Sequence, residues 1–264
     1  ALRYTVLRLA VISFLALAAS PVHAWEFVLN PPRTWFPSPQ IEQTFFNRLA
    51  LDGAGDVIAC GVVSFDGPPS QITVVKLSGR DGAPLWQQVV GGSINLRAPH
   101  DCNALAVDRQ GDVFVGGRVT VISYEVSQFV LVKLAADTGR PIWERRLGDT
   151  TDREQSALYS LAIDPRGDVV ALGTIRSTGY GSTLVKFDGG TGAEVWHVPA
   201  GGAPSTVLNG AVAVDSSGDA IVAIAELLSR NFGRLRVSKR SGVDGGESWH
   251  YELLRPPLYS VDLA

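Results

Sequence analysis

The sequence has no methionine and only two cysteines among its 264 residues, and charged residues make up 19% of it. Because methionine is absent even from position 1, we expect a fragment that lacks its initiator. The formal net charge of −3 argues against the strongly basic surface that is typical of nucleic-acid-binding domains. A hydrophobic content of 45% is enough for a packed core, so the chain should fold.

The first 24 residues have the organisation of a secretory signal peptide. Arg3 and Arg8 mark a basic region, residues 9–19 form an almost unbroken apolar run, and the small residue Ala24 closes the segment. This run is well short of the roughly 20 residues that cross a bilayer. We therefore expect cleavage after Ala24, no stable membrane anchor, and export to the periplasm, the cell surface or the medium.

The two cysteines, Cys60 and Cys102, would enter an oxidising compartment in an exported chain. Both a disulfide between them and two buried free thiols are compatible with the sequence, because sequence does not determine the Cα separation that a disulfide requires. His100 precedes Cys102 by two residues, and alternate residues of a strand share a face. A catalytic Cys–His pair is usually assembled from distant positions, so we assign no catalytic residue.

The dominant feature of the chain is a repeat of about 50 residues. Its second half places a lysine ten residues before a tryptophan, as in VVKLSGRDGAPLW, LVKLAADTGRPIW, LVKFDGGTGAEVW and RVSKRSGVDGGESW. The four tryptophans are Trp86, Trp143, Trp196 and Trp249. Their recurrence at one position indicates that each fills the same niche between repeats, which is a structural role.

The first half of each repeat reads as a β-hairpin around the turn Asp-x-x-Gly-Asp. Runs of alternating apolar residues flank the turn, as in NALAVDRQGDVFVGGRV and YSLAIDPRGDVVALGTI. The first aspartates of the four turns are Asp52, Asp108, Asp164 and Asp215. Asp and Gly are the residues that such turns favour, so we interpret them as structural. Calcium is a minor alternative, because the turn lacks the dense oxygen ligands of a calcium loop.

Each repeat therefore predicts four short antiparallel strands, A to D, and no helix, which is typical of a β-propeller blade. The AVDxxGD…VVKL…DGxxxW pattern resembles the SBBP-type bacterial propeller repeats. Its TG-x-x-x-W turn is similar to the tryptophan-docking repeats of the quinoprotein, or PQQ-like, propellers. The resemblance covers residues 46–251 and implies a ring of about six to eight blades, monomeric when complete. We expect an all-β fragment of such a ring, with a closed four-bladed ring as the minority alternative.

The expected organisation follows from these repeats. A signal peptide occupies residues 1–24, and a lead-in strand or linker follows over residues 25–45. Propeller repeats fill residues 46–264, with blades at about 46–99, 100–155, 156–206 and 207–257 and the start of another at 258–264.

Loop lengths indicate which face of the ring would bind a ligand. The A–B and C–D turns are constant in length, whereas the B–C and D–A loops vary and lie on the opposite face, because successive strands are antiparallel. We expect ligand contacts on this variable face, where aromatic and polar side chains could stack on a sugar or clamp a peptide. The candidates are Phe65, Tyr124, Tyr180, Phe232, Arg97, His100 and Arg153. The alternative, favoured by their residue types, is that the aromatics wedge between blades.

The sequence contains no P-loop, no GxSxG elbow and no metal-ligand spacing. We predict a non-catalytic scaffold that binds a protein, peptide or glycan partner, does not bind nucleic acid and needs no cofactor. The resemblance leaves open part of a PQQ-dependent or other propeller enzyme, whose quinone and calcium would lie on the ring axis. The copies lack the vicinal cysteine pair and the clustered polar set that such a site needs. A third hypothesis is an outer-membrane assembly lipoprotein similar to the PQQ-like propeller of the barrel-insertion machinery; the missing cysteine at the cleavage site argues against a lipid anchor.

Overall fold

The computed structural model describes residues 41–65, 67–90, 100–121, 126–148, 155–176, 181–201, 207–229 and 232–255. The predicted signal peptide and the predicted start of a further repeat lie outside these residues. Within them the chain forms four separate sheets, each of four antiparallel strands, and no helix. The all-β prediction is therefore confirmed.

We refer to the four sheets as blades 1 to 4. Blade 1 contains β1 (Ile41–Leu51), β2 (Val57–Phe65), β3 (Gly67–Leu77) and β4 (Pro84–Val90). Blade 2 contains β5 (Asp101–Val107), β6 (Val113–Thr120), β7 (Ser127–Leu134) and β8 (Pro141–Leu147). Blade 3 contains β9 (Ala157–Ile163), β10 (Val169–Thr174), β11 (Ser182–Phe187) and β12 (Glu194–Gly201). Blade 4 contains β13 (Val207–Val214), β14 (Ala220–Ser229), β15 (Phe232–Arg240) and β16 (Glu247–Arg255).

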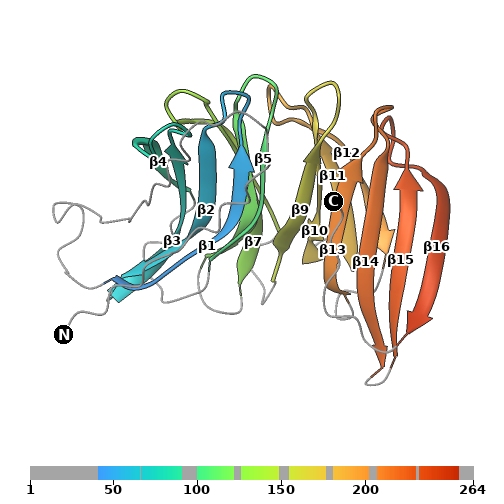
Figure 1. Ribbon diagram of the computed structural model, residues 1–264. Coiled ribbons are helices and arrows are strands. Elements are labelled where there is room, and N and C mark those ends of the chain that lie inside the picture. Colours follow the sequence, from blue (N-terminus) through green and yellow to red (C-terminus); the bar gives the residue numbers. More distant parts are fainter. Residues whose placement is uncertain are drawn as a thin grey trace, which may run out of the picture.

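Strands that are consecutive in sequence are also neighbours in each sheet, so every blade is a simple up-and-down meander. The first strand of each blade contacts the first strand of the next, in the order β1, β5, β9 and β13. The blades accordingly stand side by side in an arc, with blade 1 at one end and blade 4 at the other (Figure 1). The tight A–B and C–D turns lie together along the top of this view.

The first strand begins before the recognisable repeat motif. β1 starts at Ile41, inside the segment 25–45 that the sequence predicted as a lead-in strand or linker. The repeat motif starts later than the strand because strand pairing with β2 continues beyond the recognisable motif, as far as Ile41 opposite Phe65.

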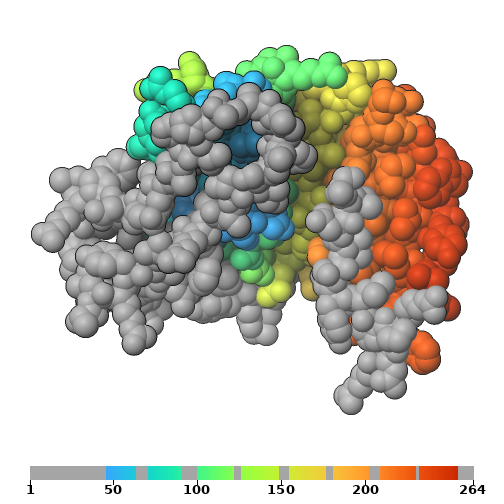
Figure 2. All heavy atoms as spheres, viewed as in Figure 1, coloured from blue at the N-terminus to red at the C-terminus, as the bar shows by residue number. Residues whose placement is uncertain are grey.

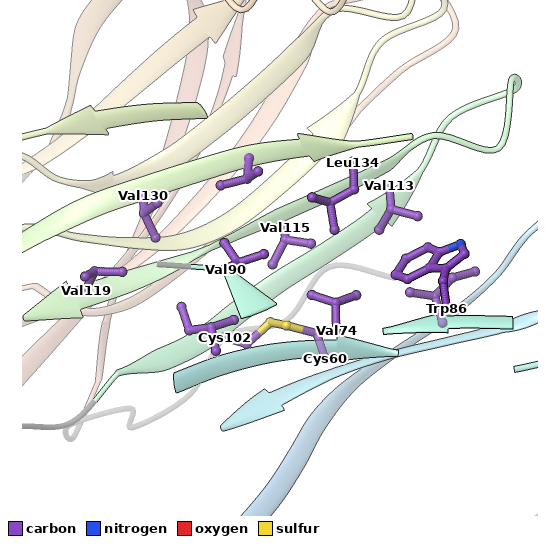
Figure 3. Packing of buried hydrophobic residues seen from close by; sticks show 13 residues of the cluster. Cys60, Val74, Trp86, Val90, Cys102, Val113, Val115, Val119, Val130 and Leu134 are labelled. Carbon is purple, nitrogen blue, oxygen red and sulfur yellow. A yellow bond between two sulfur atoms is a disulfide. The ribbon is translucent and has the colours of Figure 1, made fainter. Parts of the chain in front are cut away.

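The hydrophobic core lies between the blades. Both faces of each sheet carry apolar side chains, which must be covered by a neighbour to leave water. At the first interface, Val74 and Trp86 of blade 1 belong to one buried cluster with Val113 and Val130 of blade 2 (Figure 3). A second cluster joins blades 2 and 3, and a third joins blades 3 and 4. Each blade is thus stabilised mainly by its neighbours.

A disulfide crosses the first interface. The sulfur atoms of Cys60 on β2 and Cys102 on β5 are bonded, and their Cα atoms are 6.1 Å apart (Figure 3). Both side chains are fully buried within the apolar cluster between blades 1 and 2. Of the two alternatives that the sequence left open, the structure contains the disulfide.

Candidate functional site

The lysine of each repeat lies between the two aspartates of its own A–B turn. In blade 3, Lys186 Nζ is 2.7 Å from Asp164 Oδ2 and 3.3 Å from Asp168 Oδ2, and the lysine side chain is only 4% exposed. The same arrangement recurs as Lys76 with Asp52 and Asp56, Lys133 with Asp108 and Asp112, and Lys239 with Asp215 and Asp219. The position between the two carboxylates, where a cation would bind, is therefore taken by an ammonium group.

The lysine and tryptophan of one blade also bind the C–D turn of the next blade. Lys186 Nζ and Trp196 Nε1 both donate to the carbonyl oxygen of Gly242, at 3.0 and 3.4 Å. The two preceding interfaces are built alike, with Lys76 and Trp86 donating to Ala136, and Lys133 and Trp143 donating to Gly189. One backbone carbonyl thus accepts hydrogen bonds from two side chains of the preceding blade.

The tryptophan ring explains the glycine of the DG and TG turns. A Cβ on Gly192 would lie 2.6 Å from the ring of Trp143, and Gly192 has a φ of 69°, which glycine adopts without strain. A glycine at this position therefore lets the ring of the preceding blade lie flat against the turn. Each of the first three tryptophans lies in this way between its own blade and the next.

Blade 4 departs from this pattern. Trp249 is 48% exposed and the side chain of Lys239 is 27% exposed, and no turn of a following blade covers them among the residues that the structure describes. Figure 2 shows β16, in red, along the outer edge of the molecule. The repeat therefore presents the same residues in two settings, buried in a blade interface and exposed at the end of the arc.

The residues predicted for the variable loop face are not brought together by the described part of the chain. Tyr124, Tyr180, Arg97 and Arg153 lie outside it. Phe65 ends β2, and Phe232 begins β15 with 61% of its surface exposed. His100 belongs to blade 2 and Phe232 to blade 4, so these two candidates occupy separate blades. Ligand binding on this face stays a prediction.

His100 is buried rather than presented to a ligand. It is 1% exposed, and its Nδ1 accepts a hydrogen bond from the backbone N–H of Thr120 at 3.3 Å. Burial lowers the pKa of His100 to about 4, so the imidazole is neutral at neutral pH. Asp101 pairs instead with Arg118, at 2.5 Å, and the sulfur of Cys102 is held in the disulfide. The three neighbours in sequence therefore form no catalytic constellation.

A groove of about 370 Å³, which we call the axial groove, opens on the turn face at the inner ends of blades 2, 3 and 4. It is lined by residues 107–110, 163–167 and 214–216, which are the ends of three inner strands and the A–B turns that follow them. Sequence reasoning treated this face as scaffolding only. The sequence does contain one indication of this groove. The A–B turns of blades 2 and 3 carry Arg109 and Arg166, whereas the equivalent turns of blades 1 and 4 carry no cation between their aspartates.

The acidic and basic side chains of this groove differ in whether they have an ion-pair partner. Its three aspartates, Asp108, Asp164 and Asp215, each bind a lysine and accept hydrogen bonds from their own turn amides. Arg109 and Arg166 are exposed, and their guanidinium groups have no ion-pair partner among the described residues. Among the residues that line the groove, the two arginines are therefore the charged groups without an ion-pair partner, and each lysine is shared with the second aspartate of its turn.

Residues 70–262 match the family model PQQ_2, described as outer membrane protein assembly factor BamB. The chain belongs to this family of PQQ-like propellers. A search of the curated proteins gave no match. The SBBP part of the sequence resemblance stays a prediction.

Solved structures similar to this PQQ-like chain include propeller enzymes. A europium-containing methanol dehydrogenase aligns with a TM-score of 0.51 and 14% identity, over 82% of this chain and 44% of that chain. The quinohemoprotein alcohol dehydrogenase ADHIIG from Pseudomonas putida HK5 aligns with a TM-score of 0.45 and 17% identity, over 80% of this chain and 36% of that one. The β-propeller domain of the trilobed protease from Pyrococcus furiosus gives 0.44 and 10%, over 81% and 58%.

The similarity to the methanol dehydrogenase, with a TM-score of 0.51, shows the fold alone. The chain spans less than half the length of the two dehydrogenases, 44% and 36%.

The residues of the axial groove do not fit a quinone: no aromatic side chain lines it, and its three carboxylates already bind lysines. Among the described residues no group of three or more His, Cys, Asp or Glu is placed to hold a metal ion. In the same part of the chain, no helix has the length and hydrophobicity to cross a membrane.

Proposed function

We propose that this PQQ-like propeller is a non-catalytic binding or assembly scaffold of the cell envelope. The observation that carries the proposal is the use of the repeated lysines, aspartates and tryptophans to join blades. An ammonium group has three donors and no acceptor. Lys186 directs them at two carboxylates and one carbonyl, at 2.7, 3.3 and 3.0 Å, so this amine has no hydrogen left for a substrate.

Two further points support the envelope setting. The family description names an outer membrane assembly factor. The predicted signal peptide, residues 1–24, would direct export of the chain to the cell envelope. A partner would be a protein, peptide or glycan, bound by surfaces that the blade interfaces leave open.

The first experiment tests the absence of catalysis. The chain is incubated with PQQ and Ca²⁺ and desalted, and the retained absorbance and the dye-linked oxidation of ethanol are measured. We expect neither retained quinone nor turnover, because the axial groove offers no aromatic side chain to stack on the cofactor. Cofactor retention together with turnover would refute the scaffold proposal and favour a quinoprotein enzyme.

The second experiment tests binding. A peptide and glycan array is probed with the wild-type chain and with Tyr124→Ala, Tyr180→Ala and Phe232→Ala, which remove aromatics that the sequence predicts for the variable face. Leu254→Ala, at an exposed position of β16, is the matched control. A ligand whose signal falls in the aromatic variants but not in the control supports binding on that face. A wild-type chain that binds nothing on the array contradicts the scaffold.

A further inference from the structure

We propose that the groove on the turn face of blades 2, 3 and 4 binds an acidic peptide segment, whose carboxylates pair with Arg109 and Arg166. The inference deepens the proposed function, on which it rests, because it names the chemistry of the partner. It also places a binding site on the face opposite the variable loops, where the axial groove is lined by three A–B turns.

The turns hold the two arginines on a rigid backbone. In blade 2, Asp108 Oδ1 accepts hydrogen bonds from the backbone N–H groups of Gln110 and Asp112, at 3.0 and 2.9 Å. In blade 3, Asp164 Oδ1 accepts from Arg166 and Asp168, at 2.8 and 3.0 Å. Each guanidinium therefore projects from a closed turn, so little backbone entropy is lost when a ligand binds.

The two arginines of the groove are available to a carboxylate ligand. The aspartates that line the groove are engaged by buried or half-buried lysines: Lys133 Nζ is 3.0 Å from Asp108 and 3.2 Å from Asp112, the second aspartate of that turn. The two exposed arginines have no ion-pair partner among the described residues. A guanidinium offers paired N–H donors that match the two oxygens of a carboxylate, which gives geometric selectivity as well as attraction.

The fold itself does not require these arginines. The same turn carries Gly53 and Ala54 in blade 1, and Ser216 and Ser217 in blade 4. All four turns nevertheless close in the same way, with two backbone N–H groups donating to Oδ1 of the first aspartate. Cations therefore occur in these positions only in the second and third turns, which meet in the groove. A purely structural role does not account for their placement.

A peptide fits this groove better than a nucleic acid does. A volume of about 370 Å³ is at the low end of the range for ligand sites, so the groove would hold a few residues of an extended chain. Gln110 and Ser216, which also line it, can bond to peptide groups. The formal net charge of −3 would repel a long polyanion, whereas two or three carboxylates match two arginines.

The test uses the whole chain and a fluorescein-labelled six-residue peptide of alternating Glu and Ser, with binding followed by fluorescence anisotropy. The double variant Arg109→Gln/Arg166→Gln should weaken binding by about tenfold to a hundredfold, because charge-assisted contacts to two arginines are lost. Arg80→Gln is the matched control. It removes one positive charge, against two in the double variant, on the same face, in a C–D turn, at a side chain that is 90% exposed. Arg80→Gln should leave the affinity unchanged.

Three further arms decide between sources of negative charge. A peptide of alternating Gln and Ser should not bind, and inorganic phosphate should compete only weakly. Equal affinity of wild type and double variant, an equal loss in Arg80→Gln, or tighter arginine-dependent binding of a single-stranded oligonucleotide would each overturn the proposal. Because the readout is independent of PQQ retention and turnover, failure here leaves the scaffold proposal standing, and failure of the scaffold proposal is detected separately.

Discussion

Replacing Lys186 by methionine should strongly destabilise the protein. Methionine keeps the aliphatic length but removes three donors, which bind Asp164, Asp168 and the Gly242 carbonyl. The side chain of Asp164 is only 1% exposed, so its carboxylate would stay buried without a counter-ion. Removing one partner of a buried pair costs about 3–5 kcal/mol. For a chain of this size that corresponds to a fall in Tm of roughly 6–20 °C.

Urea unfolding followed by circular dichroism measures the effect, and Lys239→Met is the matched control. Lys239 occupies the same repeat position in blade 4, but its side chain is 27% exposed. The loss of stability should therefore be several-fold smaller. Adding Asp164→Asn to Lys186→Met should recover much of the loss, because the uncharged amide keeps Oδ1 as the acceptor of the two turn N–H groups and leaves no buried charge at this position. Equal losses of stability in Lys186→Met and Lys239→Met would refute the idea that burial in a blade interface makes the Lys186 ion pairs more important for stability than those of Lys239.

Three other predictions concern the blade interfaces. Trp143→Ala should lower the free energy of unfolding by about 3–5 kcal/mol, and Trp249→Ala by clearly less, because Trp143 is 7% and Trp249 48% exposed; similar urea midpoints would contradict this. Reduction should add two hydrogens to the native mass, and a Cys60→Ala/Cys102→Ala variant should lose about 2–4 kcal/mol of stability; an unchanged mass on reduction would exclude the disulfide. Burial lowers the pKa of His100 in the folded protein from 6.5 to about 4, so the folded state favours the neutral imidazole. The free energy of unfolding should therefore be highest above pH 6.5 and should fall as the pH decreases toward 4, by up to about 3 kcal/mol. The variant His100→Asn should lose less stability between pH 7 and 5 than wild type in urea titrations.

The candidate site was predictable only in part. The alternation of apolar residues around Asp-x-x-Gly-Asp and the Lys–Trp spacing are local patterns, so the hairpins could be predicted from residues within one repeat. The groove is formed by residues 107–110, 163–167 and 214–216, which are contributed by three repeats. No single repeat contains it, and its two arginines occupy different positions within their turns.

The amino-acid sequence by itself determined the strands, their order within each blade and the recurring turns, because these depend on hydrophobic alternation and on residues a few positions apart. Only the tertiary structure decided what the repeated polar residues do. Lys186 reaches an aspartate 22 residues earlier and a carbonyl 56 residues later, and the second contact exists because blade 4 packs on blade 3. The same packing partly buries Trp196, whereas Trp249 stays 48% exposed. Contacts between blades depend on how sheets stack, and a pattern that is the same in every repeat cannot encode which copies lie inside the arc and which lie at its end.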